Sequence, residues 1–203
     1  MNPLSLAQRQ LQAIYAIEAP PVADFIVDRE AAEQIAPGAR VGREAVLVHE
    51  VDGEAGIAVF VDPGIVDRVA AHPPGEAANA DLDAFTVVTE AVSHFLLLVH
   101  RARRDEGVSL LELETQAEVD KFVTARLATR SASGLRERLF RDAALDPALD
   151  DEERQRYATA GRLADRYCAQ LERLPHVDAL LVELRGFWRL SGHARMGRLR
   201  RAA

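Results

Sequence analysis

The chain is poor in several residue types, and each shortage excludes a class of structure or site. A single cysteine, Cys168, excludes an intramolecular disulfide and any multi-cysteine metal site. Aromatic residues make up 5% of the chain, so Leu, Val and Ala must fill the core, which favours closely packed helices. No window approaches the roughly 20 apolar residues of a membrane span, and the first residues lack the pattern of a signal peptide. We therefore expect a cytoplasmic protein without a membrane partner.

Lysine is almost absent as well, because Lys121 is the single lysine among 25 basic residues. The other basic residues are arginines, and abundant Arg and Ala indicate a GC-rich genome. The formal net charge of -7 argues against nucleic acid as a partner, since a duplex repels an acidic surface.

The common catalytic and nucleotide-binding motifs are missing too. The chain contains neither G-x-x-x-x-G-K-S/T nor G-x-G-x-x-G, so nucleotide binding by those loops is excluded. It also lacks H-E-x-x-H and G-x-S-x-G, the signatures of zinc proteases and of serine hydrolases with a nucleophile elbow. Ser93 lies within a helical pattern beside His94, where packing is the expected role.

What is present predicts an α+β fold that is mainly α. Residues 1–80 are expected to form a small α+β region with a helix over 3–17, a short strand at 23–28 and a β-hairpin at 44–61. The β-structure of this region is thus either the hairpin alone or a three-stranded sheet. Residues 81–203 have the periodicity of a helical bundle, and we expect both parts to form one globular unit.

Two central helices, about 82–104 and about 109–128, carry polar residues at helical spacing. Ser109 and Glu112 form a capping-box pattern at the start of the second. Glu90 and His94 lie one turn apart on the first helix. On the second, one face holds Glu114, Glu118 and Lys121, bracketed by apolar residues. The opposite face holds Glu112, Gln116 and Asp120, which we interpret as the solvated face.

The short connection at residues 105–108 predicts that these helices are antiparallel neighbours. Glu90 should then lie level with Lys121, and His94 level with Glu118, to within a few residues.

Three interpretations of this cluster remain open. The first is a buried ionic network that pairs Glu90 with Lys121 and His94 with Glu118. The second is a divalent metal site formed by Glu90, His94, Glu114 and Glu118, although the ammonium of Lys121 would repel a cation. The third is a metal-free acid/base site in which Lys121 or His94 carries the proton. Glu90, His94 and Lys121 are thus the catalytic candidates.

The segments "EAVSHF" and "ELETQAEVDKF" resemble a family of bacterial proteins with which no activity is associated. The resemblance covers about a sixth of the chain. It implies that these two segments are characteristic of the family. It assigns a function to none of their residues.

Arginines cluster in the C-terminal stretch "HARMGRLRRAA", which is a candidate interaction element. They are Arg195, Arg198, Arg200 and Arg201. A solvated terminal helix is the expected structure, and the alternative is contact with nucleic acid, with an acidic partner or second copy, or with the protein's own acidic surface. The sequence favours a non-catalytic interaction or regulatory module. The alternative is a metal-assisted hydrolase or redox enzyme that uses the Glu/His cluster.

Overall fold

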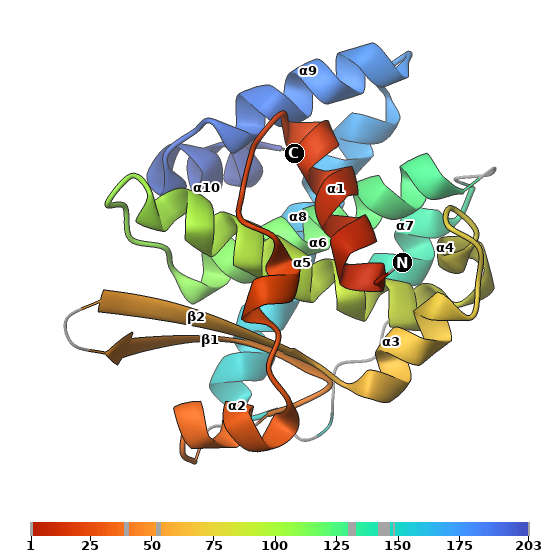
Figure 1. The fold of residues 1–203 in the computed structure, drawn as a ribbon. Helices are drawn as coiled ribbons and strands as arrows, with labels where there is room; N and C mark the ends of the chain where they lie inside the picture. Colours follow the sequence, from red (N-terminus) through yellow and green to blue (C-terminus); the bar gives the residue numbers. More distant parts are fainter. Residues whose placement is uncertain are drawn as a thin grey trace.

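A computed structural model describes residues 2–38, 41–51, 54–129, 133–141, 147 and 149–202 (Figure 1). The elements are α1 (Pro3–Tyr15), a 3-10 helix η1 (Val22–Phe25), α2 (Arg29–Ile35), β1 (Glu44–Val51), β2 (Glu54–Val61), α3 (Pro63–Ala70), α4 (Ala77–Ala80), α5 (Leu82–Ala102), α6 (Leu110–Ala128), α7 (Leu135–Phe140), α8 (Asp151–Glu172), α9 (Val177–Trp188) and α10 (Gly192–Arg201). The predicted class, α+β and mainly α, is confirmed.

The sheet has two strands in the described part of the chain. β1 and β2 pair antiparallel, with Glu44 opposite Val61 at the base of the hairpin. The predicted third strand at 23–28 is instead the turn of η1 followed by one bridge, from Ile26 to Val59. Pro20 and Pro21 precede this segment, and only the amide of Val27 continues the ladder, donating to the Val59 carbonyl at 3.0 Å. The three-stranded option was therefore wrong.

Helix α5 is the core helix of the fold. Thirteen of its 21 residues are buried, and it contacts α1, α3, α6 and both strands. An 18-residue window of α5 has a mean hydropathy of 1.6, which is high enough for a membrane span by length and composition, contrary to the expectation from the sequence. However, 67% of that apolar window is buried inside the protein, which is the setting of a core helix in a soluble fold.

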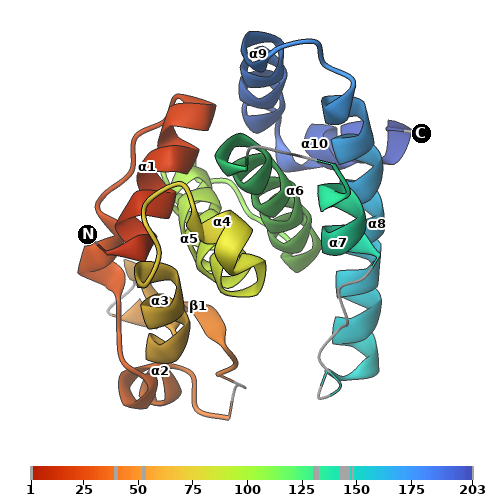
Figure 2. The ribbon, with the colours of Figure 1, turned by 90° about the vertical axis from the view of Figure 1, so that its right-hand side faces the viewer.

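Helix α6 lies between α5 and α8 (Figure 2) and is therefore covered on two sides. This position corrects the interpretation of Glu112, Gln116 and Asp120 as a solvated face. Each of the three is at most 3% exposed. Ser109 caps α6 through the amide of Glu112. The side chain of Glu112 turns inward to Arg101, at 2.6 Å.

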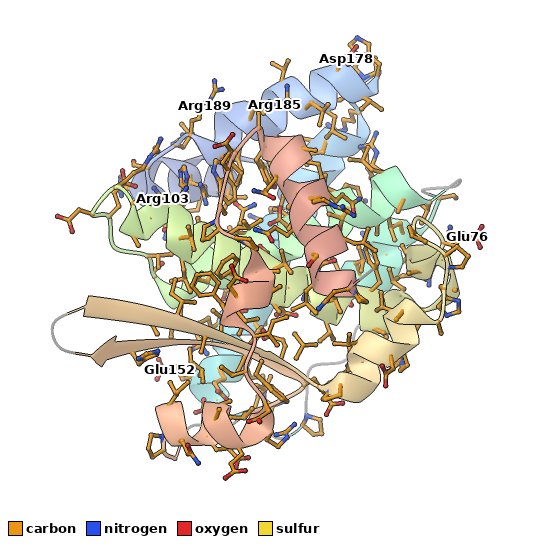
Figure 3. All side chains as sticks on the ribbon, viewed as in Figure 1. Glu76, Arg103, Glu152, Asp178, Arg185 and Arg189 are labelled. Carbon is orange, nitrogen blue, oxygen red and sulfur yellow. The ribbon has the colours of Figure 1, made fainter. Side chains whose placement is uncertain are left out.

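The C-terminal helices close the core over the end of α1. Tyr15 stacks on Trp188 with ring centroids 4.4 Å apart. Arg185 extends from α9 towards α1 (Figure 3), where it donates to the carbonyls of Ala13 and Ile14 at 3.2 and 3.1 Å. One continuous apolar core thus includes residues from α1 to α10.

Candidate metal centre

Helices α5 and α6 bring together the five side chains that the sequence predicted as a cluster. Glu90 and His94 project from one face of α5 because four residues make about one turn. Glu114, Glu118 and Lys121 occupy the facing strip of α6, and the two helices are in contact.

Lys121 forms two short ion pairs at the outer end of the cluster. Its Nζ lies 2.8 Å from Glu90 Oε2 and 2.8 Å from Glu118 Oε1. Burial alone would lower the pKa of Lys121, but Glu118 and Glu90 raise it above its ordinary value, so the ammonium stays charged. Burial tends to raise the pKa of Glu90, but Lys121, together with His94 and Arg43, lowers it below its ordinary value. The predicted pair of Glu90 with Lys121 is confirmed, and Lys121 is excluded as a neutral base.

His94 meets a different glutamate from the one predicted. Its Nε2 lies 3.7 Å from Glu114 Oε2, whereas Glu118 is paired with Lys121. The expectation of a pair between His94 and Glu118 was therefore wrong by one helical turn. The length of the connection fixes the stagger of two helices only to within a few residues, because the loop conformation also contributes.

Two potential ligand atoms in this cluster are buried without a hydrogen-bond partner among the described residues. They are His94 Nε2 and Glu114 Oε2. The backbone of Leu113 is a hydrogen-bond partner of the His94 ring, which leaves Nε2 free. Metal-binding histidines are held in this way, with one nitrogen bound to a carbonyl or carboxylate and the other on the metal.

Burial shifts the pKa values of both His94 and Glu114 towards their neutral forms. Burial lowers the pKa of His94, so its ring is neutral and presents a lone pair. Burial and the charge of Glu90 raise the pKa of Glu114 to about 8. Without a further cation, Glu114 therefore keeps a proton at neutral pH.

Helix α8 supplies the outer contacts of Glu114. Arg156 Nε lies 3.9 Å from Glu114 Oε1, and the Tyr157 hydroxyl is a hydrogen-bond partner of the same carboxylate. Burial, then the charge of Glu114, raise the pKa of Tyr157 above its ordinary range, so the phenol stays protonated.

Sequence reasoning missed a fourth carboxylate, that of Glu44 at the start of β1. Its Oε2 is buried and has no partner among the described residues. Burial, Glu90 and Glu114 raise the pKa of Glu44 well above its ordinary value. The alternation of the strand contained a signal, since Glu44 shares a face with Val46, which packs on the core.

Three donor groups come close enough to hold one ion. One ligand atom each from Glu90, His94 and Glu114 all lie within 4.8 Å of one another. Donors bound to one metal at about 2.0 to 2.2 Å lie within roughly 4.4 Å of one another, so small side-chain movements complete the set. Glu118, which the sequence included among the metal candidates, is not in this group.

Two surface hollows reach the outer end of the cluster. One, of about 470 Å³, is lined by residues that include Thr86, Glu118 and Lys121. The other, of about 430 Å³, is lined by residues that include Glu118 and Tyr157. Glu118 lines both hollows, so solvent comes within one helical turn of Glu114.

A second polar network lies deeper between α1, α5 and α6. Asp120 accepts hydrogen bonds from Ser93 at 2.6 Å, from Gln116 at 2.9 Å, and from the Tyr15 hydroxyl. Burial raises the pKa of Asp120 to about 6 in spite of these donors. Ser93 is thus engaged in packing, as the sequence indicated.

We predict that replacing Asp120 by asparagine changes how stability depends on pH. A folded-state pKa of about 6, above the ordinary 3.8, means that the folded protein holds a proton that the unfolded chain has released. The free energy of unfolding therefore falls as the pH rises from about 4 to about 6, by up to roughly 3 kcal/mol from this group. The Asp120→Asn variant should lack this decrease. Urea unfolding at several pH values measures it, and parallel curves for the two proteins would refute the assignment.

The arginines of the C-terminal stretch do not share one environment. Arg195 is 1% exposed and donates to the carbonyl of Trp188 at 2.7 Å and to Gln116 at 3.2 Å, so it differs from the predicted surface contact. One face of α10 packs on the core and the opposite face is exposed to solvent, so the other arginines of this helix differ from Arg195 in their burial. Arg198 pairs with Glu183 at 2.6 Å, whereas Arg200 and Arg201 are exposed.

Comparison with known proteins leaves the site to be interpreted from its own chemistry. No family model matches the chain, and no curated protein or solved structure matches it.

Proposed function

We propose that the protein is a cytoplasmic metalloprotein that binds one divalent cation between α5 and α6. Glu90, His94 and Glu114 are the proposed ligands. The observation that carries the proposal is the pair of buried, unpartnered atoms His94 Nε2 and Glu114 Oε2, 3.7 Å apart. Buried polar atoms without partners are costly and rare, and a cation between these two would satisfy both.

The charges around the site support a divalent ion. Four carboxylates, those of Glu44, Glu90, Glu114 and Glu118, face the two cationic groups of Lys121 and Arg156. With all four carboxylates ionised, an ion of charge +2 would bring the net charge of this cluster to zero. Without it, burial and then the neighbouring negative charges raise the pKa values of Glu114 and Glu44.

The donor set indicates which metals fit. Two carboxylates and one imidazole suit Mn²⁺, Fe²⁺ or Zn²⁺. A set of three protein ligands leaves a position open for a water or a substrate, as in catalytic sites, whereas structural sites are closed. Metal-assisted hydrolysis or redox chemistry is therefore the class of reaction that the site would support.

A second candidate function is a non-catalytic interaction or regulatory module without metal. The observation in its favour is that Lys121 closes Glu90 and Glu118 into short ion pairs, as a structural network would. Exposed Arg200 and Arg201 would then offer contacts to an acidic partner or to a second copy.

The decisive variant is Glu114→Gln, which keeps the shape of the side chain and removes its charge. Because Glu114 without a cation is protonated at neutral pH, the apoprotein should tolerate glutamine with little loss of stability. We expect wild-type protein, stripped by a chelator and reconstituted with Zn²⁺, Mn²⁺ or Fe²⁺, to bind about one ion per chain. In Glu114→Gln the affinity should fall by more than about 100-fold, beyond the usual effect of an outer-shell partner. Calorimetry and elemental analysis measure both.

A matched control is His193→Ala, since His193 is exposed and lies on α10, away from the cluster. Its metal content and affinity should equal those of the wild type. Wild-type protein that takes up none of the three metals would exclude the metal centre and leave the regulatory module. Equal affinity of wild type and Glu114→Gln would place any bound metal elsewhere.

A further inference from the structure

Glu44 differs from the other acids of the cluster because it belongs to the sheet. It is the first residue of β1 and lies opposite Val61 at the base of the hairpin. The preceding residue, Arg43, forms a two-pronged ion pair with Asp83 in the first turn of α5, at 2.8 and 2.5 Å. The Arg43 carbonyl also accepts a hydrogen bond from the Asp62 amide. The base of the hairpin is therefore attached to the N-terminal end of α5.

The ion pair of Arg43 is a weak attachment by itself. Both side chains are about half exposed, at 51% and 56%, and exposed pairs contribute little to stability. The apolar contacts of the hairpin come mainly from β2, in which Ala58, Val59, Phe60 and Val61 are buried. β1 also contacts α5 and α2, and Val46 packs against the core, so Glu44 would add a polar attachment to this apolar one.

The side chain of Glu44 is directed into the acidic cluster without a partner for Oε2 among the described residues. Glu90 and Glu114 are the like charges that act on it most strongly, and Lys121 opposes them. Glu44 is not in the group of donors that lie within 4.8 Å of one another. It is near the proposed ion but beyond the innermost ligands.

We infer that the bound metal fastens the β-hairpin to the helices through Glu44, whose carboxylate accepts a hydrogen bond from a water at the open position of the ion. This inference rests on the proposed metal centre. A bound cation would stabilise the ionised carboxylate of Glu44, which burial disfavours in its absence. The attachment of the hairpin would then depend in part on the metal, in addition to its apolar contacts with α5.

Hydrogen exchange tests this coupling on the full chain, with Zn²⁺ as the probe. On addition of Zn²⁺, we expect the amides of β1 and β2 to exchange at least about tenfold more slowly in the wild type. In Glu44→Ala the hairpin should show no such protection, and Zn²⁺ affinity should fall about 10- to 100-fold, as for an outer-shell partner. Glu44→Gln keeps an acceptor oxygen and should recover part of both effects.

Glu33→Ala on α2 is the control, because Glu33 is exposed. It should retain wild-type affinity and protection. The inference is overturned if the wild type binds Zn²⁺ and its hairpin exchanges at an unchanged rate, or if Glu44→Ala matches the wild type in affinity and protection. Absence of Zn²⁺ binding by wild-type protein would instead overturn the metal centre, and this inference with it.

Discussion

Replacement of Lys121 by methionine is expected to lower the free energy of unfolding of the metal-free protein by about 3 to 5 kcal/mol. The Lys121 side chain is 12% exposed, and its ammonium lies 2.8 Å from both Glu90 and Glu118. Methionine has a similar length and fills the same space, so the loss reports the unpaired charges and not a cavity. Urea unfolding of protein treated with a chelator measures it.

The same variant should respond more strongly to metal than the wild type. Removal of the ammonium removes the repulsion between Lys121 and a cation at Glu90, so the affinity should rise by about tenfold. At saturating metal, this restores about 1.4 kcal/mol more stability than the wild type gains. A purely structural network predicts the loss of stability but no recovery on addition of metal.

Arg126→Met is a suitable control on the same helix. Arg126 donates to the Leu171 carbonyl at 2.7 Å and belongs to no ion pair of the cluster. Its loss should destabilise the protein by an amount that does not depend on metal. An unchanged stability of Lys121→Met in the metal-free state would show that its pairs with Glu90 and Glu118 contribute nothing to the fold.

The other large effect is expected for Glu112→Ala, which should destabilise the protein by about 3 to 5 kcal/mol. Glu112 is 3% exposed and lies between two arginines that are each 1% exposed. Arg101 is 2.6 Å away and Arg195 is 3.5 Å away. Without Glu112, Arg195 retains no carboxylate in an ion pair within the described part of the chain. A buried guanidinium without an anion is strongly unfavourable.

The start of α10 is built around this carboxylate. Any side chain at position 192 would bring its Cβ to 2.5 Å from Glu112 Oε2, so the glycine there gives the carboxylate room. Glu112 also places its negative charge at the N-terminus of α10, which favours it. Thermal and urea unfolding measure the loss. Glu33→Ala should change stability by less than about 0.5 kcal/mol, and a similarly small effect of Glu112→Ala would contradict the buried network.

Much of the architecture could be predicted from local patterns. The alternation of "EAVLVHEV" and "EAGIAVFV" fixed the hairpin, and the periodicity of the two central helices fixed α5 and α6. The spacing of Glu90 with His94, and of Lys121 with Glu118, placed these residues on facing strips because helix geometry is regular. These properties depend on short stretches of chain.

Properties that depend on distant contacts could not be predicted in the same way. The partner of His94 depends on the stagger of two helices, so Glu114 was found where Glu118 was expected. The burial of Glu112 and Asp120 depends on α10 and α1, which return to α6 from opposite ends of the chain. From sequence alone, a charged helix face is interpreted as solvent-exposed unless the elements that bury it are known.

The position of Glu44 at the candidate site also depends on contacts between distant parts of the chain. Glu44 is separated from Glu90 by 46 positions, and no motif joins them, so only the packing of the hairpin on α5 brings the two carboxylates together. The sequence therefore indicated a cluster from two helices, whereas the structure adds a third contribution from the sheet and a fourth from α8.

Anomalous X-ray scattering at the zinc edge, from crystals of wild-type protein reconstituted with Zn²⁺, tests the metal centre most directly. The proposed centre predicts one strong peak within about 2.0 to 2.2 Å of His94 Nε2 and of one carboxylate oxygen each from Glu90 and Glu114. A crystal with no peak between these three side chains, or with peaks only at surface residues, would contradict it.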